Sequence, residues 1–303
     1  MNVYKNGNHQ VMIFENGTKI SSTINPDDEY FTSDFPESID LKITNKCNRG
    51  CAWCHENSSI DGKHGNINLK FIDTLKPYTE VAIGGGNPLE HPQLIDLLKK
   101  LKEQKIYANM TVNLSHFIEN FYEGINIAKL LDDKLIHGLG VSYEAYTLND
   151  EQFELFIKII NKYPNIVLHI IAGVMPNSAL ERLYDKHVKM LILGFKIFRR
   201  GITYNSNYTI RIMEKIKWLK DNLKELINHF DVVSFDNLAI KQLNVASILS
   251  DKEWDEFYQG NDGTNTMFID LVEQKFAKNS ISTKRYDILE NIEDMFDIVK
   301  KEI

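Results

Sequence analysis

The chain has 303 residues, of which 43% are hydrophobic and 25% charged, and its formal net charge is −7 at pH 7. This composition is ordinary for a folded globular protein with one large core or two smaller ones. The negative charge disfavours a nucleic-acid partner, whose binding surfaces are usually basic, although "KIFRRG" at 196–201 is a local basic patch. No apolar run approaches the roughly 20 residues of a membrane span, and the polar start carries no signal-peptide core. We therefore expect a cytoplasmic protein without a membrane partner.

The chain begins with a predicted β-hairpin unit at 1–24, because Asn-Gly turns at 6–7 and 16–17 are flanked by β-forming residues. After a polar connector, apolar runs and helical periods alternate. The predicted strands are 39–44, 80–85, 106–113, 135–142, 165–174, 188–195, 231–236 and 265–272. The predicted helices are 69–75, 91–105, 115–131, 149–163, 179–187, 208–229 and 286–303.

At least six strand–helix units in succession predict a parallel sheet with helices outside it. We therefore expect an α/β fold, a full or partial (β/α)6 TIM-like barrel with its functional residues at the carboxyl ends of the strands. The expected domains are an N-terminal β-hairpin extension (1–36), the partial barrel (37–236) and a C-terminal helical extension that completes or caps it (237–303).

All three cysteines of the chain lie in "CNRGCAWCHE", directly after the predicted strand 39–44. Cys47, Cys51 and Cys54 form the pattern C-x3-C-x2-C. An odd number of cysteines in a reducing compartment argues against a disulfide framework and for a metal or catalytic role.

Several kinds of site are compatible with part of this pattern. Three buried thiols on one helix face would fit the spacing, but the surrounding Asn and Gly residues favour a loop. A zinc site would need His55 or His64 as its fourth ligand. Residues 51–55, "CAWCH", match the attachment signature of c-type haem, and a thioredoxin-like pair would use Cys51 and Cys54. The haem signature leaves Cys47 unexplained, and the barrel pattern that follows does not suit a thioredoxin-like pair.

A fourth alternative accounts for all three thiols, which could hold a [4Fe–4S] cluster and leave one iron open to a small chelating molecule. The pattern, with the aromatic Trp53 before the last cysteine, closely resembles the signature of the radical SAM superfamily. In that family S-adenosylmethionine (SAM) chelates the open iron. The resemblance covers about residues 39–200.

The second strand ends in the glycine-rich turn "IGGGNP" at 83–88. It resembles the Gly-Gly-Glu-Pro stretch of the same family, whose backbone contacts the methionyl amine of SAM. Glycine permits close backbone approach and a positive φ, and proline fixes the exit from the strand. The resemblance assigns SAM contacts to this turn, with Asn87 in the usual place of Glu: Gly84, Gly85, Gly86, Asn87 and Pro88.

The later strand ends match the family more loosely. Polar residues there would meet the methionyl carboxylate and the ribose, and Gly173 on the fifth strand would approach the adenine. The SAM-binding candidates are Asn113, Ser142 and Gly173, and weak catalytic candidates are His116, Glu144 and Lys196. Helix capping is an alternative role for the first two, solvent exposure for Lys196, and His169 is expected in the core. Asp236 in "SFDNLAIKQL" is expected to cap a helix more than to bind substrate.

The resemblance implies an enzyme that cleaves SAM to methionine and a 5′-deoxyadenosyl radical, which abstracts hydrogen from a peptide or small-molecule substrate. It also implies an electron donor such as flavodoxin or ferredoxin. No cysteine remains for an auxiliary cluster or for hydrogen donation to a substrate radical. Three alternatives stay open: a nucleotide or nucleoside substrate, a catalytically inactive iron–sulfur protein, and a structural zinc protein.

Overall fold

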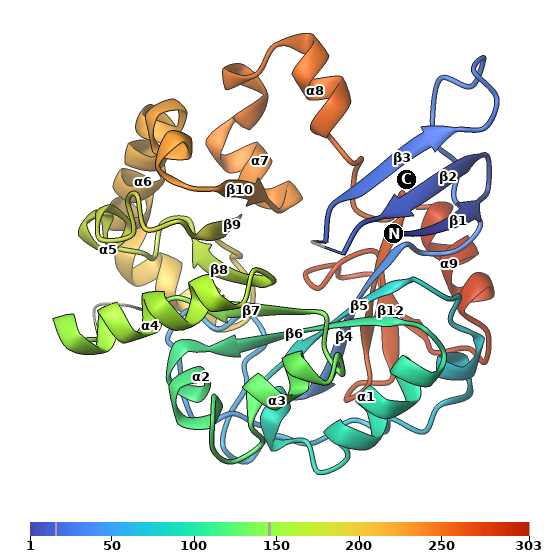
Figure 1. Cartoon of the computed structure of the whole chain (residues 1–303), viewed down its shortest axis with the longest axis horizontal. Helices are drawn as coiled ribbons and strands as arrows, with labels where there is room; N and C mark the ends of the chain where they lie inside the picture. The colour runs from blue at the N-terminus through green and yellow to red at the C-terminus, as the bar shows by residue number, and fades with distance from the viewer. Residues whose placement is uncertain (16, 145–146, 303) are drawn as a thin grey trace.

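The computed structural model describes residues 1–15, 17–144 and 147–302. Its main feature is a ten-stranded sheet with the order β10-β9-β8-β7-β6-β5-β4-β11-β12-β13 (Figure 1). Seven strands pair in parallel in chain order: β4 (Ser38–Thr44), β5 (Glu80–Gly85), β6 (Tyr107–Asn113), β7 (Gly138–Ser142), β8 (Ile166–Ile171), β9 (Lys189–Leu193) and β10 (Val232–Phe235). This is the α/β fold with a mostly parallel sheet that the sequence predicts.

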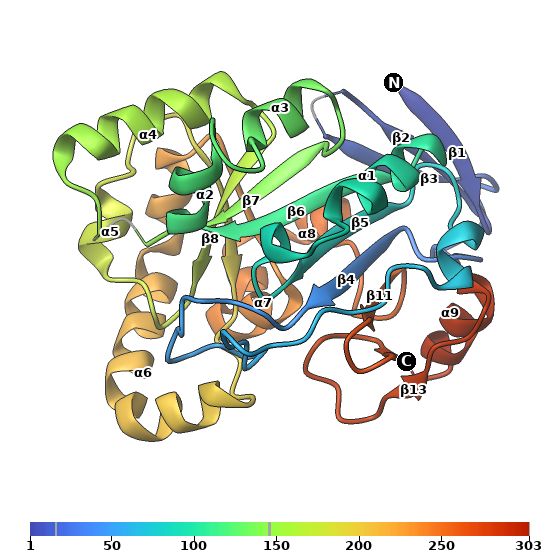
Figure 2. The ribbon, with the colours of Figure 1, turned by 90° about the horizontal axis from the view of Figure 1, so that it is seen from below.

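The helices that connect these strands lie outside the curved sheet (Figures 1 and 2). In α1, Leu94, Leu97, Leu98 and Leu101 are buried at helical spacing and form the face against the sheet. The connecting elements are η1 (Lys70–Thr74), η2 (Pro88–Glu90), α1 (Leu94–Glu103), α2 (Leu114–Asn120), α3 (Ile127–Asp132), α4 (Asp150–Lys162), α5 (Asn177–Glu181), α6 (Arg200–Leu226) and η4 (Ile227–His229).

The strands alternate between a fully buried face and a face that borders a cavity. In β6, Ala108, Met110 and Val112 are buried, whereas Thr111 and Asn113 line the cavity on the opposite face. Because side chains alternate along a strand, one face of the sheet packs against the helices and the other is free to carry polar residues.

The N-terminal segment forms a small antiparallel sheet, as predicted. It contains β1 (Asn2–Asn6), β2 (His9–Ile13) and β3 (Lys19–Thr23). The first Asn-Gly turn joins β1 to β2, and the second falls on Asn16, which lies outside the described residues. His9 Nε2 lies 2.6 Å from Glu37 Oε1, so the small sheet is fixed to the start of β4.

The C-terminal region differs from the predicted helical extension. It contains α7 (Asn237–Leu243), η5 (Val245–Ile248), α8 (Asp251–Phe257) and α9 (Ile292–Lys300), but it also adds three strands to the sheet. Strand β11 (Thr266–Asp270) pairs in parallel with β4, and β12 (Lys275–Ala277) and β13 (Tyr286–Asp287) follow in antiparallel. The pairing of β11 with a strand more than 200 residues earlier could not be read from local pattern.

Several predicted helices have different bounds. Helix α5 ends at Glu181 and not at 187, and α9 begins at Ile292 because residues 286–287 form β13. The predicted helix 115–131 is divided into α2 and α3, because Gly124 and Asn126 between them have positive φ. The long helix α6 begins at Arg200 and not at 208, and its backbone is kinked at Tyr208. Within the described part of the chain, no strand pairing joins β10 to β13, so hydrogen bonding does not close a full barrel. No helix there is long and apolar enough to cross a membrane.

Candidate functional site

A cavity of about 580 Å³ lies on the free face of the sheet, where the parallel strands end. Ligand sites of α/β proteins usually occupy this edge. The predicted site residues that line it are Cys47, Cys51, Trp53, Cys54, Gly84, Gly85, Gly86, Asn113, His116, Ser142, Glu144 and Lys196. Residues more than 140 positions apart in the sequence thus meet in one space.

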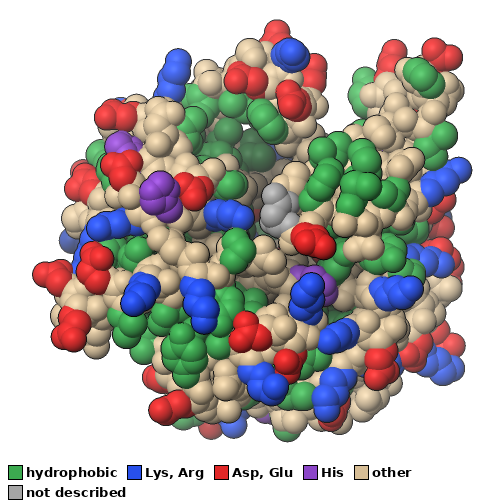
Figure 3. Space-filling model, in the orientation of Figure 1, with side chains coloured by type: hydrophobic (Ala, Val, Ile, Leu, Met, Phe, Trp, Pro, Cys, Tyr) green, Lys and Arg blue, Asp and Glu red, His purple; other side chains and the backbone are tan. Residues whose placement is uncertain are grey.

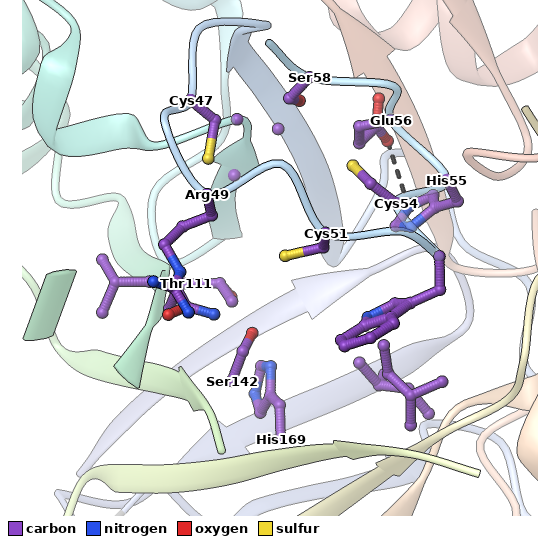
Figure 4. A pocket seen from close by; sticks show the side chains of 18 of the residues that line it. Cys47, Arg49, Cys51, Cys54, His55, Glu56, Ser58, Thr111, Ser142 and His169 are labelled. Carbon is purple, nitrogen blue, oxygen red and sulfur yellow. Dashed lines mark ion pairs between the residues drawn. The ribbon is translucent and has the colours of Figure 1, made fainter. Parts of the chain in front are cut away.

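The cysteine loop follows β4 and presents its three thiols toward a common space (Figure 4). The backbone amide of Cys47 donates to Ser59 O at 2.8 Å, and that of Cys54 donates to Cys51 O at 3.2 Å. Among the described residues, no group of three or more His, Cys, Asp or Glu converges to hold a single metal ion. A [4Fe–4S] cube would offer each thiolate a different iron, whereas zinc would need all its ligands at one point.

The glycine turn is fixed directly against the cysteine loop. Gly86 N donates to Thr44 O at 2.8 Å, and Asn87 N donates to Lys46 O at 2.7 Å. Gly85 has φ +108°, and a Cβ on Gly86 would lie 2.2 Å from Lys46 O. Both positions therefore require glycine because the two backbones approach so closely.

Gly84, the first glycine of the turn, is not constrained in this way. A Cβ added there would meet no protein atom within 4 Å, although the residue lines the cavity. The missing side chain leaves open space beside the thiols, and this space fits a ligand that approaches the backbone of the turn.

The amino end of α6 clamps the cysteine loop. Arg199 Nη1 donates to Glu56 O at 2.8 Å, and the guanidinium of Arg200 donates to Ser58 O. Arg199 also pairs with Glu273 at 2.7 Å. The basic patch at 196–201 is therefore a structural contact of the loop, and its two arginines are partly buried against it.

A buried ion-pair network lies under the same loop. Lys42, 2% exposed, pairs with Glu56 at 2.7 Å and with Asp270 on β11 at 3.1 Å. Burial alone would raise the pKa of Glu56, but His55 and Lys42 together hold it well below its usual range. Burial and the charge of Lys196 lower the pKa of His55. These ion pairs join the loop to strands β4 and β11, and removing one partner would leave an uncompensated buried charge.

Glu144, at the end of β7, brings a carboxylate to the cysteines. Its Oε2 accepts from Arg49 Nη2 at 3.0 Å, and Cys51 Sγ lies 4.0 Å from its Oε1. Burial and then the Glu144 charge raise the pKa of Cys51 to about 11. Burial also raises the pKa of Cys47. The Cys51 thiol is therefore protonated near neutral pH in the absence of metal, and iron ligation would deprotonate it.

Other predicted residues line the cavity while holding structural partners. Asn113 Oδ1 accepts from Ser115 N at 3.0 Å and caps α2, as the alternative interpretation expects. His116 Nε2 lies 2.7 Å from Asn48 Oδ1 of the cysteine loop, and Lys196 Nζ donates to Ser280 Oγ at 3.0 Å. Trp53 packs edge to face on Tyr204, with ring centroids 5.6 Å apart.

Three predicted SAM-binding residues do not border the cavity. Asn87 and Pro88 are buried, and Asn87 Oδ1 accepts from Leu89 N as the cap of η2. Gly173 has φ +81°, and a Cβ there would meet Ile212 of α6 at 2.7 Å. Its neighbours Val174 and Met175 line the cavity instead.

Several cavity residues were not predicted from sequence. Asp40 and Lys42 alternate on the otherwise apolar strand "IDLKIT", a period-two signal that places both on one face. His169, expected in the core, lines the cavity, and burial lowers its pKa to about 4. Its ring covers Gly140, where a Cβ would lie 2.2 Å from it. Asp236 caps α7 by accepting from Ala239 N at 2.7 Å, as expected.

The fold and the site define an α/β protein with a thiol-lined cavity at the carboxyl ends of a parallel sheet. No model of a protein family matches the chain, and no curated protein does. Among solved structures, SuiB from Streptococcus suis bound to S-adenosylmethionine matches 89% of this chain with a TM-score of 0.61 at 13% identity. SuiB bound to the precursor peptide SuiA matches with a TM-score of 0.59, also at 13% identity and over 89% of this chain. The chain spans 65–68% of the SuiB chains, and the likeness is one of fold.

Proposed function

We propose that this chain is a radical SAM enzyme that binds a [4Fe–4S] cluster through Cys47, Cys51 and Cys54. When bound, the cluster and SAM would together supply reductive cleavage of SAM to methionine and a 5′-deoxyadenosyl radical that abstracts hydrogen from a substrate. The carrying observation is the pair of backbone hydrogen bonds that joins the glycine turn to the cysteine loop at 2.8 and 2.7 Å. The two motifs that carry the family resemblance thereby meet at one cavity.

The glycine turn is suited to the amino acid part of SAM. The open space at Gly84 lies in the same cavity as the three thiols. Backbone approach without a side chain would allow carbonyl oxygens to accept from an ammonium group. Asn87 is buried and would act by shaping the turn, because its side chain caps η2.

Farther along the sheet edge, Asn113, Ser142 and Glu144 present polar groups to the cavity. We assign Asn113 and Ser142 to the carboxylate and ribose of SAM, with Glu144, His116 and Lys196 as the weaker catalytic candidates. Gly173 faces α6, so the adenine would be approached by its neighbours.

The likeness to the SuiB fold supports the interpretation of the sheet as a partial TIM-like barrel. We propose that this barrel spans about residues 37–236, between the extensions 1–36 and 237–303. The SuiB structure with a precursor peptide makes a peptide substrate as reasonable for this chain as a small molecule. A reduced flavodoxin or ferredoxin in the cytoplasm would supply the electron.

The test is anaerobic reconstitution with iron and sulfide, reduction with dithionite, addition of SAM and quantification of 5′-deoxyadenosine. We expect about four irons per chain and SAM cleavage by the wild type, and neither by Cys47→Ala, Cys51→Ala or Cys54→Ala. A cluster that forms while SAM leaves its EPR spectrum unchanged would favour an inactive iron–sulfur protein. Zinc without iron or sulfide would overturn the proposal.

A further inference from the structure

A second cavity of about 270 Å³ adjoins the first, and Asp40 of β4 lines both. It lies between the end of β10, with α7 behind it, and the strands β4 and β11. The sheet is open at this place, and Figure 3 shows the molecule hollowed between helices α7 and α8 and the N-terminal sheet. A molecule in the second cavity would therefore reach the thiol-lined cavity past Asp40.

The second cavity is lined by carboxylates and aromatic rings. Its charged residues are Asp40, Asp236, Asp262 and Lys278, and its aromatic residues are Phe235, Phe257 and Tyr258. Lys278 is the one cation among these described residues. Carboxylates together with aromatic faces are the groups that bind an ammonium ion.

The three carboxylates differ in their hydrogen bonds. Asp236 accepts from Gly194 N at 2.9 Å and from Ala239 N at 2.7 Å. Asp262 accepts from the amides of Asn237 and Asn279, each at 2.7 Å. For Asp40 the described residues offer its carboxylate no hydrogen bond and no ion pair within 4.0 Å.

The Asp40 side chain is exposed within the cavity, so a ligand can reach its carboxylate. The surrounding protein raises its pKa, the charge of Lys196 opposes this rise, and Asp262 and Asp236 add to it. A cationic ligand would supply the partner that the protein does not.

We propose that the second cavity is the substrate pocket and that it takes an alkylammonium group, whose N–H donates to the Asp40 carboxylate at the boundary of the two cavities. The inference that the ligand is a substrate rests on the proposed function. The new element is the chemical class of that substrate, an alkylammonium compound. The aromatic rings would cover the alkyl chain and the ammonium, and an anionic molecule would be repelled. The group could belong to a small diamine or to the lysine side chain of a peptide.

The test is isothermal titration of the reconstituted protein with three probes in parallel. These are 1,4-diaminobutane, Nα-acetyl-lysine amide and the neutral isostere Nα-acetyl-norleucine amide. We expect at least one of the two cations to bind and the neutral probe not to bind. Tighter binding of the diamine would assign a free amine, and tighter binding of the lysine derivative would assign a peptide side chain.

Asp40→Asn should weaken the binding of the cation about tenfold, because a hydrogen bond to a charged group is worth about that much. Asp96→Asn, on the exposed face of α1, is the matched control and should bind as the wild type does. Circular dichroism and a thermal melt check that both variants fold. Equal binding by Asp40→Asn, or no binding of either cation to the wild type, would overturn the inference.

Cys47→Ala separates this inference from the proposed function. The thiol does not line the second cavity, so this variant should bind the cation as the wild type does even though it cleaves no SAM. Cation binding without SAM cleavage in the wild type would leave the pocket in place and reject the radical SAM proposal.

Discussion

Cys51 Sγ lies 4.0 Å from Glu144 Oε1, and the other oxygen of that carboxylate holds Arg49 at 3.0 Å. A carboxylate so near a thiol disfavours the thiolate, while Arg49 favours it. Together with burial, these two opposing charges set the pKa of the Cys51 thiol in the metal-free protein.

Glu144→Gln should lower the pKa of Cys51 from about 11, because it removes the second-largest cause of the shift. Burial remains, so the pKa should stay above the usual value for cysteine. The measurement is the pH dependence of iodoacetamide alkylation in metal-free protein, followed peptide by peptide. Cys47, whose pKa is raised first by burial, with Glu144 not among the main causes, serves as the comparison and should shift less. An unchanged or higher alkylation midpoint at Cys51 would contradict the assignment.

The glycine turn offers a matched pair of substitutions. Gly84→Ala should leave the free energy of unfolding within about 0.5 kcal/mol of wild type, because its Cβ meets no protein atom. Gly86→Ala should destabilise the fold by about 1–3 kcal/mol, because its Cβ would lie 2.2 Å from Lys46 O. Urea unfolding of the two variants checks this order.

Ligand binding should separate the same pair in another way. Gly84→Ala would fill the space proposed for SAM, so the stable variant should lose SAM affinity in a titration of the reconstituted protein. Full SAM affinity in Gly84→Ala would show that the ligand does not approach this residue.

The sequence predicts features that depend on neighbouring residues better than features that depend on contacts between distant parts of the chain. The bounds of β5 agree with the predicted strand 80–85, because strand pattern and glycine turn are local signals. Arg199 and Glu56, in contrast, meet across 143 positions, and "KIFRRG" reads in isolation only as a basic patch. The alternation of Asp40 and Lys42 on β4 is visible in the sequence. The ion pair of Lys42 with Asp270 could not be predicted, because the sequence does not show that β11 pairs with β4.

Lys42→Met tests the buried network. Removing the ammonium leaves Glu56 and Asp270 without a main partner, and we expect a loss of about 3–5 kcal/mol in the free energy of unfolding. The double variant Lys42→Met/Glu56→Gln should recover part of this loss, because one of the two uncompensated charges is gone. A loss below about 1 kcal/mol would mean that solvent reaches the network.

The same network predicts a pH dependence. The folded-state pKa of Glu56 is lowered below its usual 4.5, so its contribution to stability is present above pH 4.5 and is lost as the pH falls toward the folded value. In Lys42→Met the pKa of Glu56 should rise toward 4.5. The difference in stability between wild type and variant should therefore stay constant above pH 4.5 and shrink as the pH is lowered below it, measured by urea unfolding at each pH.

Arg199→Ala should loosen the cysteine loop without unfolding the sheet. The variant loses the hydrogen bond to Glu56 O and the ion pair with Glu273, which join the loop to α6 and to the C-terminal region. We expect faster amide hydrogen exchange at residues 54–59 in metal-free protein and unchanged exchange in β6 and β7, because local opening follows local contacts. Arg211→Ala, on the exposed part of the same helix, is the control and should leave the loop as it is. If both variants exchange alike at 54–59, the arginine clamp does not hold the loop, and the backbone bonds of the glycine turn to Thr44 and Lys46 are then sufficient to fix it.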